Sequence, residues 1–149
     1  MNKMAPNFGA ILDQQASEIE APKPFPVGTY VCVVRGLPRF DKSSKKGTDF
    51  VEFQLQPVSV LEDVDPDALE EFGGISDKTL RVTFYITEDA VYRLKDFLVN
   101  CGIEADGRTL SEMINDAPGQ TICALVSHRA SEDGERIFAE VRRTLRYEG

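Results

Sequence analysis

Alternation of apolar and polar residues over Thr48–Val60 constrains the fold of this chain more than any other feature. Val51, Phe53 and Leu55 fall on one side of an extended backbone, and the residues between them fall on the other side. This pattern predicts a strand that places one face in a hydrophobic core.

Four further segments have the β-branched and aromatic content of strands. They are Thr29–Leu37, Lys78–Ile86, Gln120–His128 and Arg136–Tyr147. The run Ser131–Glu135, which contains Gly134, predicts a hairpin turn between the last two.

Helical signals lie mainly between the third and fourth strands. Thr87 is a good N-cap for a helix whose apolar stripe runs over 90–98 and which ends at Gly102. Leu110–Ile114 predicts a second short helix. The order is therefore three strands, a helix with a short companion, and two strands. We expect a mainly β fold, a five-stranded barrel of the oligonucleotide/oligosaccharide-binding (OB) type.

Residues 1–27 differ from this body, and we expect them to form an N-terminal arm before an OB domain over 28–149. Prolines at 22, 24 and 26 favour an extended backbone and end any helix, and a short amphipathic stretch over 8–16 precedes them. The arm is a candidate for packing on a partner or for exchange between protomers in a homo-oligomer.

Composition indicates one soluble domain of 149 residues with a net charge of -8. No apolar run is long enough to span a bilayer, and the N-terminus lacks the apolar run of a secretory signal. Cys32, Cys101 and Cys123 form no CxxC pair, so neither a zinc site nor a disulfide framework is indicated. We expect Cys32 and Cys123 to be small core residues, and we expect a cytoplasmic protein with no membrane partner.

The segment from Arg35 to Thr48 reverses the charge of the chain. Asp41 is its one anion, and it is rich in glycine and serine. Its five cations are Arg35, Arg39, Lys42, Lys45 and Lys46. We expect a turn whose cations follow a phosphate backbone.

Aromatic residues are predicted on the outward faces of neighbouring strands. Phe50 lies opposite the core residues of the second strand, and Tyr85 shares the outward face of the third strand with Arg81. On the last strand we expect Ile137, Ala139, Val141 and Leu145 to point inward. The residues expected on its outward face are Phe138, Arg142 and Arg146. Aromatic rings beside arginines can form a stacking platform for single-stranded nucleic acid. Structural cover by the arm or an acidic loop is the alternative for each ring.

Signals for enzymatic chemistry are weak. The single histidine, His128, has no acidic neighbour at helical spacing, and the chain contains no GxSxG elbow, P-loop or GxGxxG. Six carboxylates over 62–71 do not match the EF-hand pattern and predict a solvated acidic segment with a helix start at Asp65-Pro66. We expect no catalytic residue, no metal and no cofactor.

The chain resembles a family of small bacteriophage OB-fold proteins that bind single-stranded DNA. The likeness covers roughly 24–147 and rests on short matches. These are Pro24-Phe-Pro-Val-Gly28-Thr-Tyr30, Lys45-Lys46-Gly47-Thr48, Thr83-Phe-Tyr85-Ile-Thr87-Glu-Asp-Ala90, Arg93-Leu-Lys-Asp-Phe97-Leu and Asp106-Gly-Arg-Thr-Leu110. The resemblance implies a non-enzymatic role in phage DNA replication or recombination, in the cytoplasm of a bacterial host.

Unlike many single-strand binders, the chain ends in a basic stretch rather than an acidic tail. Replication or recombination proteins would then be recruited through 62–71 or the arm.

Two other functions stay open. The acidic segment and the arm could make the protein an OB interaction module for a host or phage protein. A small nuclease would need carboxylates facing the basic surface and a metal, and no spacing in the sequence demands this.

Overall fold

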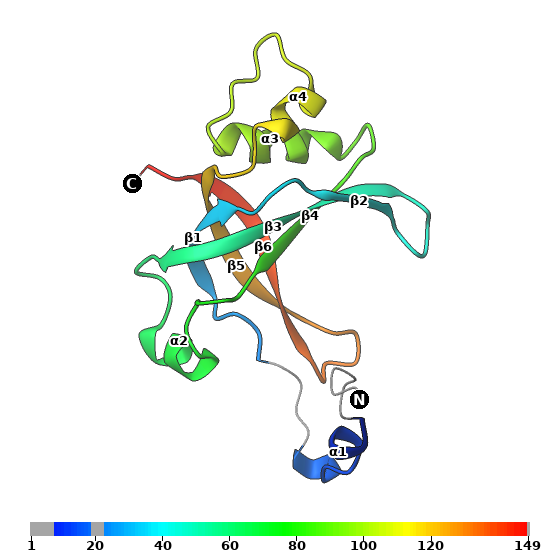
Figure 1. The fold of residues 1–149 in the computed structure, drawn as a ribbon, viewed down its shortest axis with the longest axis vertical. Coiled ribbons are helices and arrows are strands. Elements are labelled where there is room, and N and C mark those ends of the chain that lie inside the picture. Colours follow the sequence, from blue (N-terminus) through cyan, green and yellow to red (C-terminus); the bar gives the residue numbers. More distant parts are fainter. Residues whose placement is uncertain (1–7, 19–22, 149) are drawn as a thin grey trace, which may run out of the picture.

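The computed structural model describes residues 8–18 and 23–148, and most of them belong to a curved antiparallel sheet (Figure 1). The strands are β1 (Gly28–Val34), β2 (Arg39–Lys42), β3 (Asp49–Val60), β4 (Leu80–Tyr85), β5 (Thr121–Ala130) and β6 (Ile137–Arg146). The helices are α1 (Phe8–Leu12), the 3-10 turn η1 (Ala16–Glu18), α2 (Pro66–Phe72), α3 (Val91–Asn100) and α4 (Leu110–Asn115).

Strand β3 organises the sheet because it pairs along both of its edges. One edge pairs first with β2 and then with β1, and the other edge pairs with β4. Strand β1 continues to β5, and β5 to β6. The mainly β prediction is confirmed, but the sheet is open and has six strands. Over the described residues β4 and β6 are not hydrogen-bonded to each other, so a closed five-stranded barrel is not what the pairings show.

The extra strand, β2, lies inside the basic segment that the sequence predicted as a turn. Arg39 pairs with Glu52 and Lys42 with Asp49 across the β2–β3 hairpin. The turn itself is only Ser43–Thr48. It is closed by hydrogen bonds from Ser43 N to Thr48 O (2.8 Å) and from Gly47 N to Ser43 O (3.0 Å).

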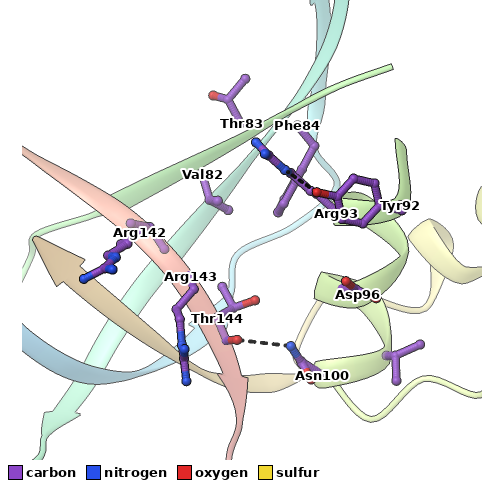
Figure 2. Close-up of a pocket in the computed structure, with 12 residues that line it drawn as sticks. Val82, Thr83, Phe84, Tyr92, Arg93, Asp96, Asn100, Arg142, Arg143 and Thr144 are labelled. Carbon is purple, nitrogen blue, oxygen red and sulfur yellow. Dashed lines mark hydrogen bonds between the residues drawn. The ribbon is translucent and has the colours of Figure 1, made fainter. Parts of the chain in front are cut away.

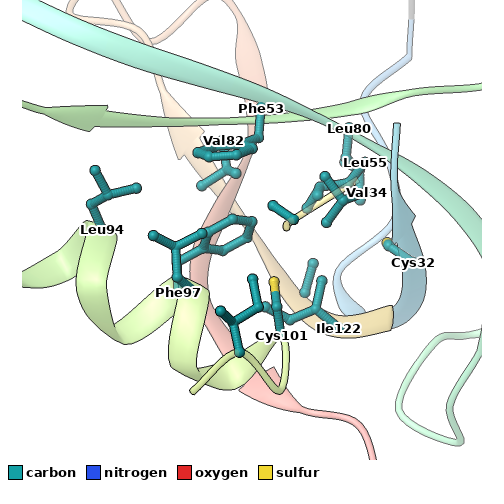
Figure 3. Packing of buried hydrophobic residues seen from close by; sticks show 14 of the residues in the cluster. Cys32, Val34, Phe53, Leu55, Leu80, Val82, Leu94, Phe97, Cys101 and Ile122 are labelled. Atoms are coloured by element: carbon teal, nitrogen blue, oxygen red, sulfur yellow. The ribbon is translucent and has the colours of Figure 1, made fainter. Parts of the chain in front are cut away.

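The core lies between the inner face of the sheet and α3 (Figure 3). Val51, Phe53 and Leu55 are fully buried, as the alternation predicted. The ring of Phe97 on α3 packs 4.7 Å from the ring of Phe53, and Leu94 lies on the same side of the helix. All three cysteines are buried and free, which confirms the predicted burial of Cys32 and Cys123. No helix within the described ranges is long and apolar enough to cross a membrane.

The predicted start of α2 at Asp65-Pro66 is confirmed, whereas α3 begins after Ala90 rather than at the predicted N-cap Thr87. Asp65 caps α2, and Gly73 ends that helix in the left-handed region. Thr87 Oγ1 accepts a hydrogen bond from Ala90 N (3.2 Å) in a turn that leads into α3. Thr109 and Glu112 form a capping box at α4. The acidic α2 lies at the end of the sheet opposite α3 and α4 (Figure 1).

The predicted faces of β6 are wrong in its C-terminal part. Pairing with β5 shifts by one residue between Leu125 and Val126, so the alternation reverses along β6. Leu145, predicted inward, is 37% exposed. Arg146 instead pairs with the buried Ile122 and therefore lies on the side opposite Phe138. Ile137 is 55% exposed because the β5–β6 hairpin extends beyond the core.

Residues 24–26, just before β1, pack on the sheet. Phe25 contacts the rings of Tyr30 and Phe72, at 5.5 and 4.7 Å between centroids. Tyr30 donates a hydrogen bond to the carbonyl of Pro26 (2.7 Å). The exposed His128 at the end of β5 donates from Nε2 to the carbonyl of Phe25, 2.7 Å away. The lone histidine therefore holds the entry segment in place.

Candidate nucleic-acid interface

The outward side chains of β3 form three rows with their neighbours on adjacent strands, because directly paired residues share a face of the sheet. We call this surface the outer face. Arg35 joins it because its amide bonds to the carbonyl of Gln54 and continues the β1–β3 register. The first row holds Asp41, Phe50 and Tyr85, the second Arg39, Glu52 and Thr83, and the third Arg35, Gln54 and Arg81.

The two aromatic residues of the first row contact each other. Tyr85 is 48% exposed, and its ring lies 6.3 Å from the ring of Phe50 at an interplanar angle of 73°. Phe50 is partly buried, and the guanidinium of Arg39 lies 5.3 Å from its centroid. Tyr85 therefore presents more open ring surface than Phe50. It is the better placed of the two to stack on a base.

Two cations of the basic segment are held by carboxylates. Arg39 forms ion pairs with Asp41 (2.6 Å) and Glu52 (3.5 Å), and Lys42 forms one with Asp49 (2.7 Å). These pairs are largely exposed, so each contributes little to stability, but they reduce the local positive charge. The guanidinium of Arg35 donates a hydrogen bond to the side-chain carbonyl oxygen of Gln56 (3.4 Å).

The remaining two cations lie beside Tyr85. The Ser43–Thr48 turn, Tyr85 and Thr87 line a surface hollow of about 610 Å³ that includes Lys45 and Lys46. Both lysines are exposed, and neither forms an ion pair with the described residues. The hollow therefore combines two cations with one exposed aromatic ring.

A larger cleft, of about 690 Å³, lies between β4, β6 and α3 (Figure 2). Arg93 reaches from α3 toward Thr83 of β4, and its Nε donates a hydrogen bond to the Tyr92 hydroxyl (3.2 Å). Arg142 and Arg143 line the cleft from β6. Asn100 of α3 donates to the carbonyl of Thr144 (3.1 Å), which fixes the helix against the edge of β6.

The structure does not unite all of the predicted residues. Phe138 is 44% exposed and pairs with Arg129 across β5 and β6, whereas Phe50 and Tyr85 pair with each other across β3 and β4. Arg146 lies on the other side of β6 from Phe138. Arg93 and Arg143 were not predicted, although the basic Arg142-Arg143 pair was visible in the sequence. Arg93 is exposed on its helix and directly precedes a buried leucine in the sequence. Only the packing of α3 places it beside β4 and β6.

Several titratable groups with altered pKa values lie away from the outer face. Hydrogen bonds from Thr29 lower the pKa of the Asp63 carboxyl in the acidic segment. Burial raises the pKa of the Cys32 and Cys101 thiols to about 12, which makes both poor nucleophiles. In the described part of the chain, no three His, Cys, Asp or Glu side chains are grouped so that they could hold a metal ion.

No protein-family model matches the chain, and a comparison with curated proteins finds no match.

Proposed function

We propose that the protein binds single-stranded DNA without enzymatic activity and with little sequence preference. The observation that carries this proposal is the hollow in which Lys45 and Lys46 adjoin the exposed ring of Tyr85. Cations can hold phosphates while an aromatic ring stacks on a base, and stacking on any base is worth about 1–3 kcal/mol. DNA rather than RNA, and a role in phage replication or recombination, follow from the family resemblance alone.

The order of strands supports an OB-type interpretation of the fold. Read as β4-β3-β1-β5-β6, with α3 between β4 and β5 in the chain, the sheet has the connectivity of a partly open OB barrel. The short β2 then extends the hairpin between the first two barrel strands. Oligonucleotides bind OB folds on the face of strands two and three, beside the loop between strands one and two. The outer face of β3 and β4 and the Ser43–Thr48 turn occupy these positions.

Charge distribution supports a binding surface confined to one region. The chain has a net charge of -8, and the six carboxylates of 62–71 lie in and around α2, at the end of the sheet away from α3. Such a body repels a polyanion except where the cations gather. We therefore expect strongly salt-dependent binding.

Titration of a fluorescent oligo-dT at several salt concentrations tests the proposal. We expect saturable binding whose logarithmic salt slope is about -0.7 for each neutralised phosphate. The variant Lys45→Glu/Lys46→Glu should bind more weakly with a shallower slope. The control Lys23→Glu/Lys95→Glu makes the same change of charge at exposed lysines outside the hollow. Equal affinity of the wild type and both variants would remove the hollow from the proposal, and no binding at low salt would reject the function.

A protein-interaction module is the second candidate, and the acidic end of the molecule favours it. All six carboxylate residues of 62–71 are exposed, and two of them, Asp63 and Asp65, accept hydrogen bonds from the backbone. The other four carboxylates at this end could dock a basic partner, including a replication or recombination protein. If oligo-dT fails to bind at low salt, this candidate becomes the preferred one.

A further inference from the structure

The cleft between β4, β6 and α3 is more positive than the outer face. Arg93, Arg142 and Arg143 line it against a single carboxylate, Asp96 (Figure 2). All three arginines are exposed, and none forms an ion pair with a carboxylate of the described residues. The outer face, by contrast, has three arginines against Asp41 and Glu52. The cleft therefore has the larger excess of uncompensated guanidinium groups.

The cleft adjoins the outer face through one residue. Thr83 stands between Arg81 and Tyr85 on the outward side of β4, and it also lines the cleft. Successive outward residues on a strand are separated by about 7 Å, roughly one step of an extended nucleotide chain. A strand stacked on Tyr85 therefore needs only a short continuation past Thr83 to reach Arg93.

We propose that the cleft is a second phosphate-binding subsite, which holds the same single strand of DNA beyond its stacked bases. This proposal rests on the proposed function. The path runs from Lys45 and Lys46, across Tyr85 and Thr83, to the guanidinium groups of Arg93, Arg142 and Arg143. Guanidinium groups suit this role because their forked donors match the oxygens of a phosphate.

The architecture explains why this subsite is open. The edges of β4 and β6 are not joined by hydrogen bonds in the described sheet, and α3 spans the gap between them. The bond from Asn100 to the carbonyl of Thr144 holds the helix at one side of the gap. The open junction of the sheet thus provides a polar groove with arginines on two walls, one from α3 and one from β6.

The length of the DNA separates this subsite from the outer face. Oligo-dT of about 4 nucleotides matches the smallest site size of a single OB fold, and about 16 nucleotides matches the largest. The test variant is Arg93→Gln/Arg143→Gln. Both positions are exposed, and neither was among the residues predicted from the sequence to bind DNA. The control is Lys23→Gln/Lys95→Gln, with the same loss of charge and with Lys95 on the same helix outside the cleft.

We expect the test variant to bind the longer oligo-dT about tenfold more weakly, with a salt slope reduced by about 1.4, and to bind the shorter one like the wild type. The control should match the wild type at both lengths. Unchanged affinity and slope for the longer DNA would overturn the subsite while leaving the proposed function in place. An equal loss of affinity for the longer and the shorter oligo-dT would overturn the separation of this subsite from the outer face. Failure of the wild type to bind either length would overturn the proposed function and the subsite together.

Discussion

The ring of Tyr85 meets the ring of Phe50 nearly edge-on, with 6.3 Å between their centroids. The two residues are direct partners across β3 and β4, so both rings point away from the core. Because Phe50 supports one edge of Tyr85, a face of the tyrosine ring stays available to a ligand beside the Ser43–Thr48 turn.

Removal of the Tyr85 ring should weaken binding of oligo-dT. We expect Tyr85→Ala to lose about 1–3 kcal/mol of binding free energy, and Tyr85→Phe to keep most of the affinity because it keeps the stacking surface. Fluorescence titration measures both. Tyr147→Ala, at a similarly exposed tyrosine outside the outer face, is the control. A loss in Tyr85→Phe as large as in Tyr85→Ala would assign the effect to the hydroxyl rather than to stacking.

The ion-paired lysine of the basic segment should matter less than the unpaired ones. Lys42 Nζ lies 2.7 Å from the carboxylate of Asp49, so this pair has no net charge to offer a phosphate. We expect the neutral replacement Lys42→Gln/Asp49→Asn to leave affinity and salt slope unchanged. Lys45→Gln/Lys46→Gln should reduce the slope by about 1.4. Equal reductions in the two variants would show that Lys42 leaves Asp49 when DNA binds.

The contrast between Lys42 and Lys45 shows which features of the basic segment could be predicted from the sequence and which could not. The charge reversal over 35–48 was plain, but β2 was not predicted, because Arg39-Phe40-Asp41-Lys42 has one apolar residue and no run of strand formers. This strand forms through pairing with β3, which sets Arg39 opposite Glu52 and Lys42 opposite Asp49. The carboxylates that compensate these cations come partly from β3, so local charge counting overestimated the free charge.

Strand β3 was predicted well, and β6 was not, for a related reason. The alternation of β3 stays in phase over Val51, Phe53 and Leu55, and pairing with β4 proceeds without a register shift. In β6 the phase changes beside Arg142, where the pairing with β5 shifts. A shift of this kind depends on the partner strand, so the β6 sequence alone could not place Arg146. The arginine cleft was missed because it needs β6, which is distant in the chain from β4 and α3.

Gly28 should be the glycine least tolerant of substitution at the start of the sheet. Its φ is +140°, and a Cβ there would lie 2.5 Å from Cγ2 of Val64 and 2.9 Å from the carbonyl oxygen of Asp63. We expect Gly28→Ala to lower the free energy of unfolding by about 2 kcal/mol or more, since both backbone strain and overlap oppose it. Denaturant titration followed by circular dichroism measures this.

Gly36 provides the matched control for that substitution. It has a φ of +68°, and a methyl group added there would meet nothing within 4 Å, so Gly36→Ala should lose only about 1 kcal/mol. Equal losses in the two variants would mean that the approach of Val64 to Gly28 adds nothing to the conformational cost.

Asp63 should make the stability of the fold depend on acidity. Its carboxylate accepts hydrogen bonds from the amide (2.8 Å) and the hydroxyl (2.7 Å) of Thr29, whose side chain is buried at the start of β1. These bonds favour the ionised form and lower the pKa below its ordinary value of 3.8 in the folded protein. The unfolded chain therefore takes up a proton at higher pH than the folded one. The contribution of these hydrogen bonds to stability is complete well above pH 3.8 and is lost as pH falls from there toward the folded pKa.

We expect Asp63→Asn to lower the free energy of unfolding at neutral pH by about 1 kcal/mol and to flatten the decline of that free energy in acid. Glu71→Gln removes a charge from the same exposed segment and should leave the acid decline unchanged. Denaturant titrations of the three proteins across this pH range measure the effect, and an acid decline in Asp63→Asn as steep as in the wild type would contradict the role of this carboxylate.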